Sequence, residues 1–324
     1  MRVLLVGGGN IPIPPPGWGG VENLIWQQKC ALEREGHEVA ICNKNVPGSR
    51  KYLLAMHARP WQYDVVHLHH DSHTKYWLFW SRLRRFPLVV STHYGYAAFP
   101  KKWKKSYQRT FRWMRRADYL ILISGEIKSV FERLGCHAEM FVLPNGINCD
   151  ATRFGPDAEK QAIVLGRIEH RKQQAFLADL LDGHSAQCDF VGPMDEDTGF
   201  AVNGKNTQYL GEWDREQVCC NLTRYACLVL LSDGEGHAAV VSEAMAAGLS
   251  LVLSPEASHN LDLSRPWIYV VDREQKDITD VIQQAVRDNP AYRSQIRQHC
   301  RQHFDWSVIL PRYIGFLERV TSAK

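Results

Sequence analysis

The chain has 324 residues, of which 45% are hydrophobic and 23% charged, with a formal net charge of +4. This length exceeds what a single core normally supports, and the composition is that of an ordinary globular protein, so we expect two domains. No apolar run reaches the roughly 18 residues of a membrane span. The nine scattered cysteines lack a CxxC pair, which favours reduced thiols in a cytosol over disulfides or zinc.

The first half alternates short apolar runs with amphipathic stretches. We expect strands at residues 2–7, 38–42, 64–68, 87–91, 118–123 and 140–143, with helices between them. Apolar runs such as VLLV and YLILI suit strands that are covered on both faces. This pattern predicts a parallel, doubly wound sheet.

The turn after the first strand, GGGNIPIPPPGWGGVEN, joins stiff prolines to glycines that let the backbone approach a ligand at the next helix start. The turn is not a GxGxxG motif. The second strand also ends in AICNKN, without the acidic residue that a dinucleotide site needs. A nicotinamide cofactor is therefore not expected, and a loop without any ligand remains an alternative.

The segment 64–73, DVVHLHHDSH, carries four histidines. His67 and His69 should share one strand face while His70 points away, and no metal-binding spacing follows, so zinc is the weaker interpretation. The simpler interpretation is a strand end at the rim of a cleft. There His70 or Asp71 would contact an acceptor.

Residues 101–116, KKWKKSYQRTFRWMRR, predict a basic amphipathic helix, and residues 82–116 contain eleven Lys and Arg but no Asp or Glu. The apolar side of this helix is formed by Trp103, Tyr107, Phe111 and Met114. Either this side packs on the sheet with the cations in solvent, or the helix adheres to anionic lipid headgroups near a lipid-linked acceptor. Nucleic acid is not expected as a partner, because no recognised binding module accompanies the charge.

Near residue 144 the pattern breaks into PNGINCDATRFGPDAEK, a polar, turn-forming stretch that we interpret as an interdomain linker. A second series of strands is expected at residues 162–165, 187–191, 207–210, 227–231, 250–253 and 268–271. The sequence thus predicts an α/β protein of two Rossmann-like, doubly wound domains. A ligand is expected in a cleft at the carboxyl ends of their strands.

The stretch 231–248, LSDGEGHAAVVSEAMAAG, predicts a strand end, a glycine-rich turn and a short helix from about Ala238 to Gly248. Such a helix start offers unpaired N–H groups and a positive dipole end, which predicts an anion site. Glu235 and Glu243 flank it, and eight helical residues span roughly 12 Å. Glycosidase carboxyl pairs lie about 5 to 9.5 Å apart, so these two are better placed to hold both ends of an elongated phosphorylated ligand.

The segment DGEGHAAVVSEAMAAG resembles the E-x7-E signature of the retaining glycosyltransferases of family 4, which have the two-domain GT-B fold and nucleotide-sugar donors. Further segments resemble this family in order along nearly the whole chain. The proline–glycine loop resembles P-x-x-Y-G-G-x-E with Trp18 in place of Tyr, and STHYGY resembles its T-H-G segment. GRIEHRKQ resembles G-R-L-x-x-x-K-G with Gln173 in place of the last Gly, and HFDWSVILPRYIGFLERV resembles the closing helix that packs on the first domain.

The resemblance implies a retaining, metal-independent hexosyltransferase that moves a sugar from a nucleotide diphosphate to a hydroxyl acceptor. It implies that Glu235 and His93 are catalytic, and that Arg167 and Lys172 hold the diphosphate. The other implied donor-binding residues are Gly19, Gly20, Tyr209, Leu210, Gly236, His237, Ala238 and, on the ribose, Glu243. Trp18, His70 and Asp71 are candidates for the acceptor site.

The expected domains are residues 1–148 with the closing helix 305–324, on the acceptor side, and residues 149–304, on the donor side. No cofactor is expected, and UDP or GDP is the expected nucleotide. The acceptor is expected to be a sugar or a lipid-linked molecule in glycolipid, lipopolysaccharide or polysaccharide synthesis. The expected location is the cytoplasm, with the inner face of a membrane as a further option. The alternatives are a GT-B epimerase or phosphorylase and a non-catalytic nucleotide-sugar sensor.

Overall fold

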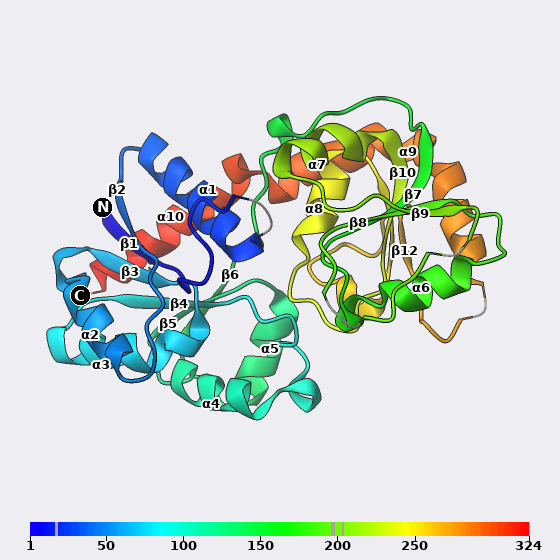
Figure 1. Cartoon of the computed structure of the whole chain (residues 1–324). Coiled ribbons are helices and arrows are strands. Elements are labelled where there is room, and N and C mark those ends of the chain that lie inside the picture. The colour runs from blue at the N-terminus through cyan, green and yellow to red at the C-terminus, as the bar shows by residue number, and fades with distance from the viewer. Residues whose placement is uncertain (17–18, 196–197, 203, 276, 324) are drawn as a thin grey trace. The chain divides into compact units, whose positions relative to one another are not determined.

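The computed structural model describes residues 1–16, 19–195, 198–202, 204–275 and 277–323. The chain divides into two compact units (Figure 1). Unit 1 comprises Met1–Gly146 and Trp306–Lys324, and unit 2 comprises Ile147–Asp305. These boundaries lie within two residues of those expected from the sequence.

Unit 1 contains a six-stranded parallel sheet in the order β2-β1-β3-β4-β5-β6. Its strands are β1 (Arg2–Val6), β2 (Glu38–Cys42), β3 (Val65–Leu68), β4 (Leu88–Thr92), β5 (Tyr119–Leu122) and β6 (Glu139–Val142). Its helices are α1 (Gly20–Arg34), α2 (Arg50–His57), α3 (Thr74–Arg84), α4 (Lys105–Met114), α5 (Gly125–Arg133) and α10 (Trp306–Ser322). The helices α1 and α10 lie on one face of the sheet, and α2 to α5 lie on the other (Figure 1).

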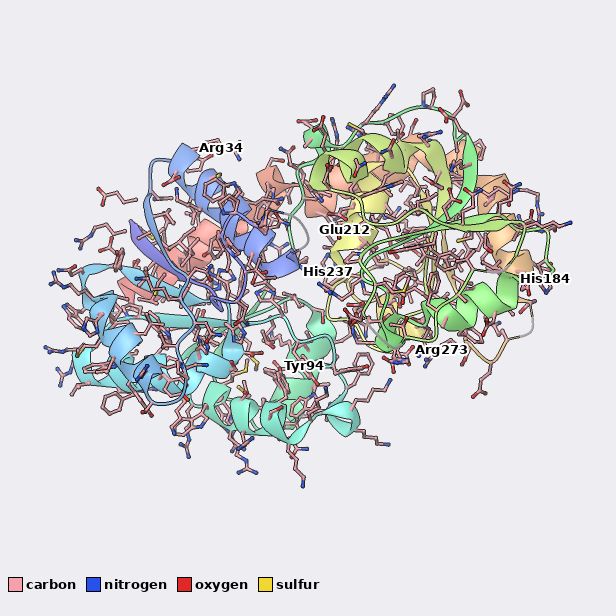
Figure 2. All side chains as sticks on the ribbon, in the orientation of Figure 1. Arg34, Tyr94, His184, Glu212, His237 and Arg273 are labelled. Carbon is pink, nitrogen blue, oxygen red and sulfur yellow. The ribbon has the colours of Figure 1, made fainter. Side chains whose placement is uncertain are left out.

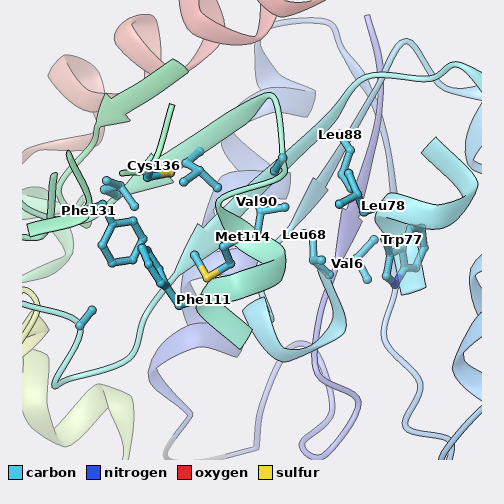
Figure 3. Close-up of a cluster of buried hydrophobic side chains, with 14 of the residues drawn as sticks. Val6, Leu68, Trp77, Leu78, Leu88, Val90, Phe111, Met114, Phe131 and Cys136 are labelled. Carbon is cyan, nitrogen blue, oxygen red and sulfur yellow. The ribbon is translucent and has the colours of Figure 1, made fainter. Parts of the chain in front are cut away.

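Successive strand residues of unit 1 enter two different cores, as the alternation of side chains along a strand requires. Leu4 and Val6 pack with the aromatic side chains of α3, α4 and α5, and Figure 3 shows this cluster. Val3 and Leu5 pack with α1 and α10. Because both faces are covered, the strands are mainly apolar, and their positions could be predicted from short apolar runs.

Unit 2 repeats the architecture, with a six-stranded parallel sheet in the order β12-β11-β10-β7-β8-β9. Its strands are β7 (Lys160–Leu165), β8 (Cys188–Val191), β9 (Thr207–Tyr209), β10 (Tyr225–Leu230), β11 (Ser250–Leu253) and β12 (Ile268–Val270). Its helices are α6 (Gln174–Leu181), α7 (Arg215–Asn221), α8 (Ala239–Ala246) and α9 (Ile278–Phe304). The prediction of two doubly wound sheets is confirmed.

Short 3-10 turns connect several of these elements. They are η1 (Pro60–Gln62), η2 (Asp71–His73), η3 (Pro100–Lys102), η4 (Cys149–Ala151), η5 (His170–Lys172), η6 (Leu222–Arg224) and η7 (Pro255–Ala257). Among the described helices, none combines the length and the apolarity that a bilayer crossing needs.

The basic segment 101–116 is not one helix, so that prediction is wrong in its first four and its last two residues. The turn η3 ends at Lys102, Trp103 and Lys104 are extended, and α4 begins at Lys105. The reason is that Trp103 turns into the core, where its indole N–H donates to the Tyr96 carbonyl over 2.9 Å. The stripe of Trp103, Tyr107, Phe111 and Met114 is buried. The aromatic side of the segment therefore packs on the sheet, as the first alternative predicted.

From Ile147 onward, the predicted linker is fixed within unit 2. The Ile147 N–H donates to the Phe304 carbonyl over 2.9 Å, and Arg297 donates to the carbonyls of Cys149 and Thr152. In unit 1, Trp306 begins α10 against Gly146, where an added Cβ would lie only 2.7 Å from the indole. The closing helix thus packs on the first domain, as its sequence predicted.

Candidate active site

Each sheet has a point where the strand order reverses direction, and ligands of such folds bind outside the carboxyl ends of the strands there. In unit 2 this point lies between β7 and β10, which are paired neighbours although 60 residues separate Leu165 from Tyr225. The segments that follow these strands are residues 166–173 and 231–238. They carry the Gly-Arg-Lys motif and the first half of the E-x7-E motif.

Glu235 is a buried carboxylate in the turn between β10 and α8, with 9% of its surface exposed. Its Oε1 accepts from the Arg171 guanidinium over 2.7 Å and from the Ser232 hydroxyl over 3.2 Å. Arg171 also donates to the Gly234 carbonyl over 2.5 Å and pairs with Glu169 over 2.6 Å. The two loops at the strand ends are thus joined by one arginine.

Sequence reasoning missed Arg171. Burial lowers its pKa, but the carboxylates of Glu235 and Glu169 outweigh burial and raise the pKa above its usual value. Arg171 is therefore a permanent cation that orients Glu235. Its position beside Lys172 in EHRKQ could have indicated this role, but the family pattern G-R-L-x-x-x-K-G contains only the lysine.

Lys172 ends the turn η5, and its ammonium lies over Gly166, where an added Cβ would be 2.5 Å from Nζ. Gly166 has φ +133°, a conformation that side chains disfavour. Across the described ranges, no carboxylate lies within ion-pairing distance of Lys172. The glycine therefore leaves room for an ammonium without a counter-ion.

Gln173 stands where the family pattern has glycine, and the structure explains why glycine suits this position. Gln173 has φ 58° and ψ 29°, in the left-handed region, and it links η5 to α6. The backbone follows the course that a glycine would give, at some strain to glutamine. The departure in sequence is thus not a departure in backbone conformation.

The start of α8 has no side-chain cap. Its N-cap residue is Ala238, whose side chain has no polar atom to cap the first N–H groups of the helix. Gly236, His237 and Ala238 lead into this helix and are buried. The His237 ring, labelled in Figure 2, stacks on Phe304 at 5.4 Å, and its Nε2 lies 3.3 Å from the Ser242 hydroxyl.

Glu243 lies on α8 and forms an ion pair with Arg215, the first residue of α7. Sequence reasoning did not identify Arg215. Burial lowers the pKa of Arg215, but Glu243 outweighs this and raises the pKa. The pair fixes the direction of the Glu243 carboxylate, whose second oxygen has no partner in the described part of the chain and can accept from a ligand hydroxyl.

The remaining donor-side candidates lie at the ends of β7 and β9. The exposed Arg167 side chain pairs with Asp195 over 2.9 Å, and an exposed pair of this kind exchanges easily for a phosphate. Tyr209 and Leu210 are 38% and 36% exposed, and the Tyr209 hydroxyl donates to the Gly192 carbonyl over 2.8 Å. These residues offer apolar surface next to backbone groups.

In unit 1 the strand order reverses between β1 and β3, and histidines gather at this edge. His67 bridges the Tyr313 and Ser91 hydroxyls, over 2.6 Å each, and its ring lies 3.8 Å from that of His69. His69 Nδ1 lies 3.4 Å from Nε2 of His93, which follows β4. The buried Nε2 of His69 has no hydrogen-bond partner in the described structure.

These imidazoles are neutral at physiological pH. Burial lowers the pKa of His67 to about 3 and, together with His70, that of His93 to about 4. Burial also lowers the pKa of His69 well below its usual value. A neutral His93 can donate one hydrogen bond and accept another, as recognition of a sugar hydroxyl requires.

Asp71 points back into unit 1. Its Oδ2 accepts from the Thr92 hydroxyl over 2.6 Å, and Thr92 also contacts the Tyr107 hydroxyl at 2.9 Å. Burial raises the pKa of Asp71 to about 6. Tyr107 in turn stacks on Tyr94 at 4.1 Å, and Tyr94 is labelled in Figure 2. Asp71 is thus tied to the core through Thr92, while His70 remains at the edge.

Gly19 is the N-cap residue of α1, and Gly20 begins the helix. An added Cβ at Gly20 would have no atom within 4 Å, so the backbone there is open to a ligand. Trp18 lies outside the described residues. Within those described, no three His, Cys, Asp or Glu side chains are grouped so that they could hold a metal ion, and the nine cysteines are free thiols.

The structure thus gathers the predicted site residues in two groups. One group lies at the carboxyl ends of β7 and β10 in unit 2 and contains Lys172, Glu235 and the start of α8. The flanking elements of unit 2 carry Arg167, Tyr209 and Glu243. His70, Asp71 and His93 lie at the edge of the unit 1 sheet.

Two family models match the chain. The model of Glycosyltransferase Family 4 matches residues 47–151, and the model of Glycosyl transferases group 1 matches residues 152–303. A search of curated proteins gives no match.

Solved structures share the fold. Sucrose-phosphate synthase from Thermosynechococcus elongatus has a TM-score of 0.80 at 15% identity, with 100% of both chains covered. HepE from Anabaena, in complex with UDP-glucose, has a TM-score of 0.76 at 16% identity, with 98% of this chain and 100% of that chain covered. AviGT4, a glycosyltransferase involved in avilamycin A biosynthesis, has a TM-score of 0.69 at 17% identity, with 100% and 98% covered. The two family matches adjoin and together span residues 47–303, and the chain belongs to the glycosyltransferases of the GT-B fold.

Proposed function

We propose that the protein is a retaining glycosyltransferase that moves a sugar from a nucleoside diphosphate, UDP or GDP, to a hydroxyl acceptor. The observation that carries this proposal is the group at the β7/β10 edge: a buried Glu235 held by Arg171, beside an ammonium without a counter-ion and an uncapped helix start. HepE was solved with UDP and with UDP-glucose, which supports a donor of this class.

In this proposal the positive groups of unit 2 hold the diphosphate. Departure of the nucleotide leaves negative charge on the phosphate oxygens, and preorganised cations and N–H groups stabilise it. Lys172 and the first N–H groups of α8 act directly, and Arg167 joins them by exchanging Asp195 for a phosphate oxygen. With these cations in place, transfer proceeds without a metal ion or other cofactor. Tyr209 and Leu210 contact the base, and Glu243 takes the ribose hydroxyls.

Glu235 faces the transferred sugar. Its Oε1 is occupied by Arg171 and Ser232, and its Oε2 has no partner among the described residues. We assign Oε2 to a sugar hydroxyl, where the carboxylate also stabilises positive charge that develops at the anomeric carbon. Gly236 and His237 offer backbone N–H groups to the same sugar and its phosphate.

The chemical step retains the anomeric configuration. The acceptor oxygen forms its bond to the anomeric carbon on the face from which the diphosphate oxygen leaves. The hydroxyl proton passes to the leaving phosphate. His93 donates a hydrogen bond to a hydroxyl of the transferred sugar, and Gly19 and Gly20 let the backbone approach the donor. Trp18, His70 and Asp71 are assigned to the acceptor side.

We further propose a cytoplasmic protein that acts in glycolipid, lipopolysaccharide or polysaccharide synthesis and adheres to anionic membrane through residues 101–116. Because the aromatic stripe is buried, this adhesion depends on exposed cations: Lys101, Lys102, Lys104 and Lys105. Wild-type protein should sediment with anionic vesicles, and salt or reversal of the four lysines to Glu should abolish this. Sedimentation that is indifferent to both would refute the membrane role.

The main experiment follows nucleotide release from a panel of UDP- and GDP-sugars with mixed hydroxyl acceptors. Glu235→Gln and Lys172→Met should each lower turnover by roughly 100-fold or more, since both act on charge in the transition state. Glu318→Gln, an exposed carboxylate on α10, is the matched control and should keep full activity.

Product analysis separates the alternatives. Retained configuration in a glycoside product supports the proposal. A free epimer or a sugar phosphate would indicate an epimerase or a phosphorylase instead. Donor binding without nucleotide release would indicate a sensor, and near wild-type turnover in both site variants would refute the assignment.

A further inference from the structure

A second polar group lies at the strand-reversal point of unit 1, beside the histidines already described. Loops after β1, β2 and β3 meet there, and α2 begins at Arg50, directly after the β2 loop. The Asn43 side chain ties the first two loops together, accepting from the Gly9 N–H over 2.7 Å and donating to the Ile11 carbonyl over 2.8 Å. This edge is therefore built by several segments and is not a single loose loop.

Lys51, in the first turn of α2, points into this group. Its Nζ lies 2.8 Å from Nε2 of the buried His73 and 5.8 Å from the ring centre of Tyr76. No carboxylate of the described residues pairs with it, whereas Lys29, Lys128 and Lys160 each have an acidic partner. The carboxyl of Asp71, two residues before His73, accepts from the Thr92 hydroxyl instead.

The Lys51 ammonium is consequently a positive charge that no carboxylate of the described residues pairs. Burial, together with His70 and Lys51, lowers the pKa of His73 to about 3, so His73 is neutral and accepts a hydrogen bond from the Lys51 ammonium. Burial also lowers the pKa of Lys51. A half-buried ammonium without a counter-ion is costly unless a ligand supplies the missing charge.

His70 is held in place beside His73. Its ring stacks on His73 at 4.6 Å and packs against Gly8, where an added Cβ would lie 2.4 Å from its Cδ2. The Ser72 hydroxyl lies 2.8 Å from Nδ1. When this hydroxyl donates to Nδ1, the ring proton lies on Nε2, which can donate to a ligand.

We infer that Lys51 and His70 form a subsite for an oxyanion, a phosphate or a carboxylate, carried by the acceptor. Lys51 supplies the charge and His70 the directed hydrogen bond. The inference rests on the proposed function in placing the acceptor at the unit 1 edge, and it adds a residue and a chemical class to that assignment. The sugar-accepting substrate is thus anionic.

Binding can be tested without any donor. The probes are inorganic phosphate, glucose 6-phosphate, glucuronate and glucose, titrated into the whole chain while NMR follows the ring signals of His70 and His73. We expect the anionic probes to shift these signals and glucose to leave them unchanged. Glucose 6-phosphate binding more tightly than glucuronate identifies the phosphate as the source of charge, and the reverse order identifies the carboxylate.

Variants then assign the effect to Lys51. Lys51→Met should weaken the anionic probes at least tenfold, and Lys51→Arg should restore most of the affinity. Arg50→Met, an exposed cation in the same helical turn, is the control and should bind as wild type does. Histidine signals that do not respond in the wild-type protein, or equal affinities in wild type and Lys51→Met, would overturn the subsite. Because no donor is present, failure of nucleotide release leaves this result untouched.

Discussion

The two units share one architecture, yet they differ in the polar side chains at the carboxyl ends of the strands where the strand order reverses. These side chains are mainly charged in unit 2 and mainly neutral in unit 1. Unit 2 holds permanent charges in pairs, Arg171 with Glu235 and Arg215 with Glu243, next to an unpaired Lys172. Unit 1 holds neutral imidazoles, of which His67 and His93 have pKa values near 3 and 4, and Lys51, which no carboxylate of the described residues pairs. The fold fixes where a ligand binds, and the side chains fix which charge it carries.

The difference suits the two partners of a transfer reaction. A diphosphate leaving group needs fixed positive charge that is already in place, and carboxylates keep those cations oriented. Acceptor and sugar hydroxyls need groups that both donate and accept hydrogen bonds, which neutral histidines provide. Four predictions test whether the two units differ in this way.

The first prediction concerns a variant that lacks Arg171, the arginine that orients Glu235. Arg171→Met leaves a buried carboxylate without its partner, which should cost about 3 to 5 kcal/mol of unfolding free energy and lower turnover by roughly 100-fold. Chemical denaturation and nucleotide release measure the two effects. Arg224→Met, which breaks the exposed pair with Glu159, should cost less than about 1 kcal/mol. Equal losses in the two variants would remove the special role of Arg171.

The second prediction compares how the stability of the two units changes as the pH falls. His67, His73 and His93 have folded pKa values near 3, 3 and 4, below the usual 6.5, so the unfolded chain binds protons first as pH falls. Their contribution to stability is complete above pH 6.5 and is lost below it, at roughly 1.4 kcal/mol per histidine and pH unit.

Asp71, with its pKa raised to about 6, acts in the opposite direction, and the three histidines outweigh it. Hydrogen exchange at pH 7 and pH 5 should show protection falling in the strands of unit 1 more than in those of unit 2. An equal fall in both units would contradict the neutral histidine edge.

The third prediction concerns Glu243, which we proposed to hold the ribose of the donor. Arg215→Met frees Glu243 from its partner, and we expect UDP or GDP to bind about tenfold more weakly because the carboxylate is no longer oriented. Inorganic pyrophosphate, which has no ribose, should bind equally well to the variant and the wild type. Calorimetry measures both, and an equal loss for pyrophosphate would place Arg215 on the phosphates.

The fourth prediction, a change at Gln173, has the smallest expected effect. Gln173→Gly relieves a left-handed backbone, φ 58°, and should raise the unfolding free energy by up to about 1 kcal/mol with turnover unchanged. Gln174→Gly, in the first turn of α6, serves as contrast and should destabilise. Destabilisation by Gln173→Gly would show that its side chain, which donates to the His170 carbonyl, outweighs the strain.

The sequence predicted the fold well, because strands buried on both faces appear as apolar runs and glycines mark their ends. Motifs in the sequence identified Glu235 and Lys172 as site candidates, and in the structure both follow the carboxyl ends of the neighbouring strands β10 and β7. Sequence reasoning missed Arg171 and Arg215, because their importance comes from partners 64 and 28 residues away, and separations of that size leave no local pattern. Lys51 was missed for the same reason, since only the folded chain shows that no carboxylate of the described residues pairs with it.

Contacts that are distant in sequence also explain why the helix bounds predicted for residues 101–116 were wrong. The spacing of Trp103, Tyr107, Phe111 and Met114 correctly identified one apolar side, but it could not show that Trp103 leaves the helix to donate its indole N–H to Tyr96. A periodic pattern reports which residues share a side, and tertiary hydrogen bonds decide where the helix begins.

The most direct test of the account is calorimetric titration of UDP, UMP and uridine, with the guanosine series in parallel, into wild-type protein and Lys172→Met. The account predicts that the diphosphate of one series binds at least tenfold more tightly than its monophosphate, and that Lys172→Met removes most of this difference. Diphosphates that bind no better than nucleosides, or an unchanged preference in Lys172→Met, would contradict a diphosphate site at the edge of the unit 2 sheet.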